Sequence, residues 1–265
     1  MRDAKHEMGD ARWEMRKKII LIMFLSLSFV IGHLSFCEAV RPLYTEDCRG
    51  PLMGKAIIES GWLLLTRRDD TGVNEFITSI KYGWTDKIVL SMDLPYMSVY
   101  SPAGNYDGMS TGTFKMKYNF YKNALETENA CFLLGYQVDT DNPQNSSEPN
   151  AHDLTTMFIY SNDLGNFSYH LNLGYQFDDE PGGQPREDSI LYNASLIKPI
   201  SDIINVMGEV QYSINTYTSD IVGETALGFN YKYNKNLLFD LAVGCGLNEN
   251  SSSSNLALGL TCLFD

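Results

Sequence analysis

The sequence predicts an all-β protein, a transmembrane antiparallel up-and-down β-barrel of about 12 strands. Three observations support this prediction. An apolar stretch near the start has the form of an export leader. The rest of the chain contains short segments in which apolar and polar residues alternate. The connections between these segments alternate between short turns and longer polar loops, as in barrels of the bacterial outer membrane.

The leader precedes the first alternating segment. Basic residues 16–18 are followed by an apolar run at 19–31, and Cys37-Glu38-Ala39 has the small-x-small pattern of a cleavage site. The run is shorter than the about 20 residues that a membrane-spanning helix needs. We therefore expect residues 1–39 to be a cleaved signal peptide, with Met15 as an alternative functional start, and the protein to be exported to the bacterial outer membrane.

The mature chain is predicted to be one domain behind a short N-terminal segment. Residues 40–54 are too polar and too interrupted by proline for a strand, and we interpret them as a periplasmic segment or a plug. Residues 55–265 are assigned to the barrel. Removal of the six bases and five acids of the leader leaves 14 bases and 28 acids, a net charge near −14. A chain this acidic is a poor binder of nucleic acid.

The clearest predicted strand is Phe167–Phe177. Its odd-numbered residues are aromatic or leucine, and its even-numbered residues are polar or glycine. Side chains of a strand alternate between two faces, so one face of this strand is apolar and the other is polar. In a barrel the apolar face contacts lipid and the polar face lines the lumen.

The same pattern predicts strands along the whole mature chain. They are placed at residues 55–67, 73–84, 87–98, 111–121, 129–139, 153–161, 166–177, 189–198, 203–215, 222–233, 236–247 and 254–264. The short turns lie at 85–86, 164–165, 199–202 and 234–235. The longer polar loops lie at 100–110, 140–152, 178–188, 216–221 and 248–253. Aromatic residues fall mostly towards the strand ends, where amphipathic rings favour the lipid interface.

Two groups of residues resemble the motifs of a known family. The mature chain starts with Arg41-Pro42-Leu43-Tyr44-Thr45-Glu46-Asp47, and Tyr82-Gly83-Trp84-Thr85-Asp86-Lys87 runs into Asp93-Leu94-Pro95-Tyr96. In this order they resemble the outer-membrane transporter family linked to the meta-pathway of phenol degradation. The resemblance implies a signal peptide, an outer-membrane barrel and transport of small, hydrophobic or aromatic molecules. It carries over no catalytic or substrate-binding residue, and Cys48 stands where the family usually has a small residue.

Charged residues of both signs fall on the polar face of the predicted strands. We interpret them as a pathway whose charges select solutes. A closed barrel filled by ion pairs is an equal alternative, because a lumen of about 12 strands lies between the filled small barrels and the open porins. The predicted lumen-lining residues are Glu59, Glu75, Lys81, Asp93, Lys115, Lys117, His170, Glu209, Glu224, Lys232 and Asp240.

The cysteines of the mature chain show no CxxC or Cys/His cluster, so no metal site is expected. Cys245 and Cys262 lie in the apolar phase of the last two predicted strands, as lipid-facing hydrophobes. Cys48 lies in the N-terminal segment, and Cys131 lies in the inward phase of the fifth predicted strand, near its periplasmic start. A disulfide between Cys48 and Cys131 is a hypothesis for an exported protein.

The sequence favours a channel over an enzyme. It contains no nucleophile elbow, P-loop or paired-carboxylate motif, and we expect no catalytic residue and no cofactor. The first hypothesis is an outer-membrane channel for passive uptake of small molecules, whose partners are outer-membrane lipids, the barrel-assembly machinery and the solute. The alternative is a non-conducting structural or surface-binding barrel. A third hypothesis, a lipid hydrolase, needs His170 and a nucleophile from a neighbouring strand.

Overall fold

The computed structural model describes residues 44–67, 71–102, 104–138, 153–178 and 188–264. The predicted signal peptide, the loop at 140–152 and most of the loop at 178–188 lie outside these residues. The strands are β1 (Ala56–Thr66), β2 (Gly72–Gly83), β3 (Ile88–Ser101), β4 (Gly104–Met109), β5 (Gly112–Lys122), β6 (Glu128–Val138), β7 (Leu154–Asp163), β8 (Ser168–Phe177), β9 (Ser189–Ser201), β10 (Ile204–Asn215), β11 (Ile221–Asn234), β12 (Leu237–Gly246) and β13 (Ser254–Phe264).

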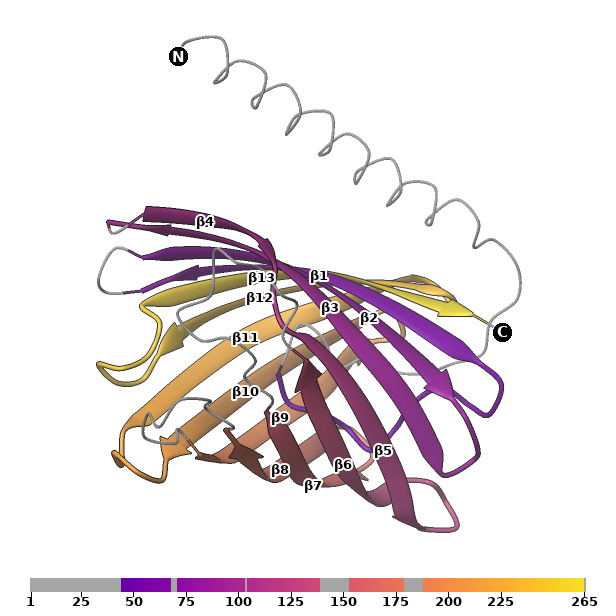
Figure 1. Ribbon diagram of the computed structural model, residues 1–265. Coiled ribbons are helices and arrows are strands. Elements are labelled where there is room, and N and C mark those ends of the chain that lie inside the picture. The colour runs from indigo at the N-terminus through magenta and orange to yellow at the C-terminus, as the bar shows by residue number, and fades with distance from the viewer. Residues whose placement is uncertain (1–43, 68–70, 103, 139–152, 179–187, 265) are drawn as a thin grey trace, which may run out of the picture.

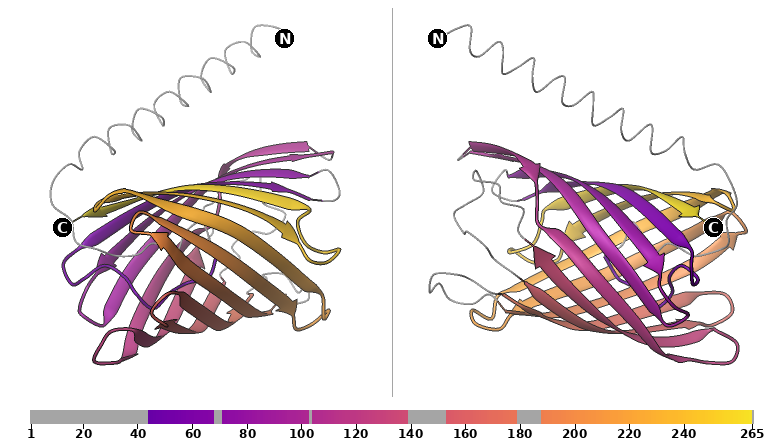
Figure 2. Two further views of the ribbon diagram at one scale, coloured as in Figure 1. Left: turned by 180° about the vertical axis from the view of Figure 1, so that it is seen from behind. Right: turned by 45° about the vertical axis from the view of Figure 1, so that its right-hand side comes forward.

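The strands form one closed antiparallel sheet. Apart from β4 and β5, which both pair with β3, strands that follow one another in the chain pair with each other, and β1 pairs with β13 from Ala56 to Thr66. Figures 1 and 2 show the tilted strands wrapping into a barrel. Except along β4, which pairs on one side only, the backbone hydrogen bonds of the wall are made between neighbouring strands of the sheet, as a bilayer requires. Among the described residues we find no helix long and apolar enough to cross a membrane.

The barrel has 12 positions around its wall, as the sequence predicted. The short β4 does not add a thirteenth, because β3 pairs with β4 over residues 96–101 and with β5 over residues 88–93. β4 and β5 thus share one position and are separated by a break at residues 110–111.

The predicted loop at 100–110 is wrong. β3 continues to Ser101, and β4 turns back along it, so that the two strands form a hairpin at the loop end of the barrel (Figure 1). Asn105, Asp107 and two glycines gave this stretch the composition of a loop. Its backbone nevertheless pairs with β3, and the Ser98 hydroxyl donates a hydrogen bond to the Asp107 carboxylate at 2.5 Å across the hairpin. Polar residues suit a hairpin that extends into water.

The two ends of the barrel differ in the length of their connections. Short connections such as Leu164–Phe167, where Gly165 adopts a φ of +73°, lie at the end where β1 begins and β13 ends. We call this the turn end. The longer connections, including 67–71 and 247–253, lie at the opposite end, which we call the loop end. The four short turns that the sequence predicted therefore lie together at the turn end, whereas the two-residue connection between β3 and β4 lies at the loop end.

The inner and outer faces of the wall differ in polarity. On β8, His170 and Asn172 are buried, whereas Leu171 and Leu173 are about half exposed. The rings of Phe120 and Phe132 on β5 and β6 stack on the outer face with their centroids 4.9 Å apart. An apolar outer face and a polar inner face are the arrangement expected of a barrel in lipid.

Candidate functional site

The N-terminal segment, residues 44–54, lies inside the barrel. The backbone N–H of Tyr44 donates a hydrogen bond to the Glu209 carboxylate at 3.0 Å, and the next N–H donates to the other oxygen of that carboxylate. Glu209 is buried at the middle of β10. Met53 forms a β-bridge with Gly83 at the turn end. The segment therefore runs from the middle of the lumen to the turn end, where β1 begins.

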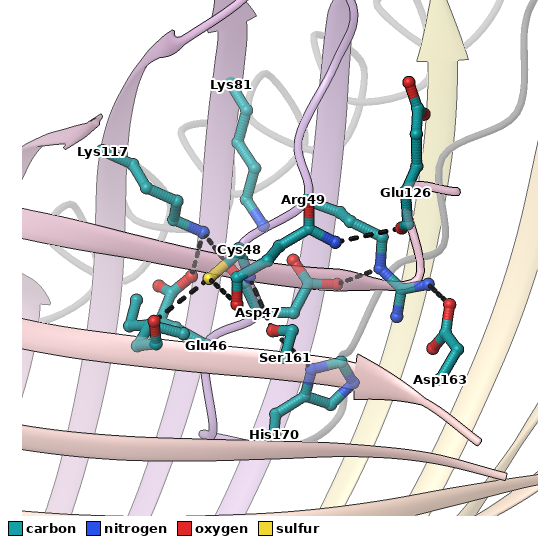
Figure 3. Close-up of polar contacts among 12 residues, drawn as sticks. Glu46, Asp47, Cys48, Arg49, Lys81, Lys117, Glu126, Ser161, Asp163 and His170 are labelled. Carbon is teal, nitrogen blue, oxygen red and sulfur yellow. Dashed lines mark hydrogen bonds and ion pairs between the residues drawn. The ribbon is translucent and has the colours of Figure 1, made fainter. Parts of the chain in front are cut away.

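Charged side chains bind the segment to β3 and β5. The Glu46 carboxylate lies between Lys115 and Lys117, and each Nζ is 3.1 Å from one of its oxygens. Lys115 also contacts Asp93 at 2.8 Å, and Lys117 donates a hydrogen bond to the Asp47 carbonyl oxygen. Figure 3 shows Lys117 reaching toward the segment. We call Glu46, Asp93, Lys115 and Lys117 the ionic cluster. None of their side chains is more than about a quarter exposed, so the loss of one partner leaves charges poorly solvated.

A second group of contacts binds the segment to β7 and β8 (Figure 3). The backbone N–H of Cys48 donates to the Ser161 hydroxyl at 3.0 Å, and this hydroxyl is 2.9 Å from His170 Nδ1. The Arg49 guanidinium is 3.2 Å from the Asp163 carboxylate. Ser161 and His170 are fully buried beneath the segment. The segment is thus held by β5, β7 and β10, which lie on different sides of the lumen.

The charge state of Glu46 follows from its surroundings. Burial alone would raise the pKa of Glu46, but Lys117, Lys115 and Lys81 attract the carboxylate and hold its pKa well below the ordinary value of 4.5. Glu46 is therefore ionised at neutral and mildly acid pH, so the ionic cluster is intact under these conditions.

Beside the segment lies a cavity of about 300 Å³. It is lined by the segment and by residues of β1, β2, β3, β5, β12 and β13. Its acidic lining residues are Glu46, Asp47, Glu59, Glu75, Asp93 and Asp240. Its basic lining residues are Arg49, Lys81 and Lys115. The cavity therefore presents more negative than positive charge.

Each predicted lumen-lining residue lies in the inward phase of its strand. Glu59, Glu75, Lys81, Asp93, Lys115 and Asp240 line the cavity. Lys117 and Glu209 contact the N-terminal segment directly, and His170 does so through Ser161. Glu224 lies apart near the loop end, where it accepts hydrogen bonds from Gln211 and Ser252. Lys232 also lies away from the cavity, next to buried Leu238 on β12.

The sequence reasoning did not identify the residues through which the segment binds. Glu46, Asp47 and Arg49 were part of a stretch interpreted as a tail or a plug, and Ser161 was not singled out. A signal was present, because Glu46 and Asp47 belong to the motif Thr45-Glu46-Asp47. No period-two pattern marks an irregular segment, so periodicity alone could not assign its contacts.

Gly83 has a structural role that explains its place in the Tyr82–Lys87 motif. The N–H of Gly54 donates to the Gly83 carbonyl oxygen at 2.8 Å, so the segment passes directly over this glycine. A Cβ at position 83 would lie 2.2 Å from the carbonyl oxygen of Leu52, which is a backbone atom and cannot rotate away. Only glycine permits this close approach.

Replacement of Gly83 by alanine is therefore expected to destabilise the folded barrel by about 1–3 kcal/mol, the usual cost of overpacking. The measurement is the urea midpoint for loss of the heat-modifiable folded form on gels. Gly72→Ala on the same strand is the matched control, because a Cβ there meets no atom within 4 Å. Equal midpoints for the two variants would contradict the assigned close contact.

Comparison with protein families decides the relationship of this chain to known proteins. The model of the family described as "Putative MetA-pathway of phenol degradation" matches residues 53–264. The chain belongs to this family. The match confirms the family resemblance and covers the motifs around the β2–β3 turn, whereas the motif at residues 41–47 precedes the matched residues.

Solved structures share the fold at low sequence identity. An outer membrane channel from Pseudomonas putida F1 is 15% identical with a TM-score of 0.67, and the alignment covers 86% of this chain and 100% of that one. The NanC porin is 10% identical with a TM-score of 0.58, covering 78% of this chain and 98% of that one. The KdgM porin is 13% identical with a TM-score of 0.55, covering 79% and 99%.

One curated protein shows a local sequence match. The LPS-assembly protein LptD of Acinetobacter baumannii is 40% identical over 74 residues, which is 28% of this chain. The match spans 8% of the length of LptD. It therefore concerns a short stretch of a much longer protein.

Proposed function

We propose that this family member is an outer-membrane channel for passive diffusion of small molecules, and that its N-terminal segment narrows the lumen. The observation that best supports this proposal is the charged cavity beside the segment within a closed barrel. The turn end then faces the periplasm and the loop end faces the outside. Structures with this fold include proteins described as a channel and as porins. Outer-membrane lipids, the barrel-assembly machinery and the solute are the proposed partners.

The proposed solutes are small hydrophobic or aromatic molecules. This class follows from the family description, which names phenol degradation. The cavity supports a size limit, because about 300 Å³ is at the lower end of volumes that hold small ligands. Tyr44, Leu63 and Ile77 contribute apolar or aromatic surface to its lining.

Liposome swelling tests this proposal with the mature protein, Val40–Asp265. Protein-dependent swelling is expected in serine and, at a higher rate, in phenylalanine. Leucine is the matched comparison for phenylalanine, because it is apolar without an aromatic ring. Equal swelling rates in leucine and phenylalanine would contradict a preference for aromatic solutes. A folded, heat-modifiable protein that gives no swelling in any solute would favour the non-conducting structural barrel.

Conductance is expected to depend on pH through Glu46. The lowered pKa of this carboxylate means that the ionic cluster stabilises the docked segment fully above the ordinary pKa of 4.5. This stabilisation is lost only as the pH falls through the lowered value. Bilayer recordings should therefore give constant conductance from pH 7 to about 5 and larger, less steady currents in more acid solution. A rise centred near neutral pH would contradict the assignment to Glu46.

The hydrolase hypothesis gains a specific observation, because Ser161 on β7 is hydrogen-bonded to His170 on β8. A serine and a histidine in contact are two of the groups that nucleophilic catalysis needs. Both are fully buried, however, and the Ser161 hydroxyl already accepts the N–H of Cys48. We propose that the pair holds the segment. Phospholipid turnover that is lost in Ser161→Ala but kept in Asn172→Ala would contradict this view.

A further inference from the structure

Two cysteine side chains lie together inside the barrel. Cys48 on the N-terminal segment is 1% exposed and Cys131 on β6 is 0% exposed. Both belong to one buried cluster, which includes Met157 and Ile159 of β7. In the structure both are thiols.

The hydrogen bonds of Cys48 determine its position relative to Cys131. Cys48 Sγ donates to the Ile159 carbonyl oxygen at 3.2 Å and lies 3.6 Å from the Asn129 carbonyl oxygen. Ile159 is the residue directly opposite Cys131 on the neighbouring strand, and Asn129 precedes Cys131 by two residues on the same strand. Neighbouring strands are about 4.8 Å apart. A sulfur within reach of both carbonyls lies beside the inward-facing side chain of Cys131.

We propose that Cys48 and Cys131 form a disulfide in the exported protein, which links the N-terminal segment covalently to β6. An oxidising compartment on the way to the outer membrane is where such a bond forms and persists. The other two cysteines differ from this pair. Cys245 and Cys262 lie in the outward phase of β12 and β13, and residue 262 faces Leu237 and not the other cysteine.

The bond forms by thiol–disulfide exchange with a disulfide-bonded protein or small-molecule donor. The Cys48 thiolate attacks one donor sulfur and displaces the other as a thiolate, which gives a mixed disulfide. The Cys131 thiolate then attacks the Cys48 sulfur and releases the second donor thiol. Two protein thiols lose two protons and two electrons, and the donor disulfide is reduced to two thiols.

The surroundings of Cys48 suit it for the first attack. Cys131 donates a hydrogen bond that lowers the pKa of the Cys48 thiol, and Ser161 and Lys117 lower it further, which together outweigh the effect of burial. The thiolate is the reactive form in exchange. The resulting link would add a covalent attachment on β6 to the contacts that the segment makes with β5, β7 and β10. If the channel function proposed above holds, the linked segment cannot leave the lumen without reduction, so recordings that test release of the segment, by acid or by variants of Glu46, are made with reductant present.

Differential alkylation of the full mature protein tests the bond. Protein is isolated from membranes without reductant and denatured, free thiols are blocked with one reagent, and thiols freed by reduction are labelled with a second. We expect the second label on Cys48 and Cys131 and the first on Cys245 and Cys262. The first label on all four, or a peptide joining Cys48 to another cysteine, would overturn the proposal.

Variants and a separate readout complete the test. In Cys131→Ser, Cys48 should carry the first label, whereas the double variant Cys245→Ser, Cys262→Ser should leave the labelling of the pair unchanged. The labelling pattern does not depend on conduction. A silent barrel with this pattern would therefore contradict the proposed channel function and support the proposed disulfide. In a conducting barrel, reductant should raise the conductance of the native protein but not that of Cys131→Ser. An equal response in both would show that the disulfide does not control the conductance.

Discussion

With reductant present, replacement of Glu46 by lysine is expected to release the N-terminal segment and to raise single-channel conductance several-fold. The variant places a third cation beside Lys115 and Lys117, both of which contact the Glu46 carboxylate at 3.1 Å. Removal of one partner from a largely buried ion pair costs about 3 kcal/mol, and this shifts the ratio of docked to released segment roughly 100-fold. Larger current steps with frequent transitions between levels are therefore predicted in planar bilayers.

Two variants make this result specific. Glu46→Gln keeps the size of the side chain and removes its charge without repulsion, so its effect should be smaller than that of lysine. Asp202→Lys is the matched control, because Asp202 lies exposed in the β9–β10 turn and its replacement makes the same change of net charge. Native-like currents in Glu46→Lys, with the variant folded, would show that the ionic cluster does not retain the segment.

The channel is expected to prefer cations, and reversal of one charge at the cavity is expected to reduce this preference strongly. Six acids and three bases line the cavity, and charges that line a narrow path select ions of the opposite sign. Glu75→Lys changes this to five acids and four bases. The reversal potential in a salt gradient should show cation selectivity for the native protein and a permeability ratio near one for the variant.

Glu75 suits this test because it lines the cavity and is not one of the four residues of the ionic cluster. Asp202→Lys provides the control, because Asp202 lies exposed in the β9–β10 turn and makes the same change of net charge. If Asp202→Lys shifts the reversal potential as much as Glu75→Lys does, overall charge and not the cavity sets the selectivity. Anion preference in the native protein would contradict the assigned path.

Much of the fold could be predicted from the sequence, because strands that face lipid on one side carry a period-two pattern. Phe167–Phe177 was predicted as a strand, and β8 covers Ser168–Phe177. The β3–β4 hairpin was missed, because Asn105, Asp107 and two glycines give the β4 stretch no period-two pattern. Where neither face meets lipid, alternation no longer distinguishes a strand from a polar loop.

The candidate site could be predicted only in part. The inward phase of each strand identified the charged residues of the wall, since any side chain opposite a lipid-facing one must point inward. The contacts of the N-terminal segment could not be predicted, because Glu46 and Lys115 are 69 residues apart and no local pattern connects them. Ser161 was missed for a related reason, because its partners Cys48 and His170 come from two other elements.

The most direct test of the account is single-channel recording of mature Val40–Asp265, refolded and inserted into a planar bilayer. The account predicts small, steady, salt-dependent current steps for the native protein and larger, fluctuating steps for Glu46→Lys. Folded protein that is silent both as the native form and as Glu46→Lys would contradict it, because a barrel whose segment has been released would then still provide no path.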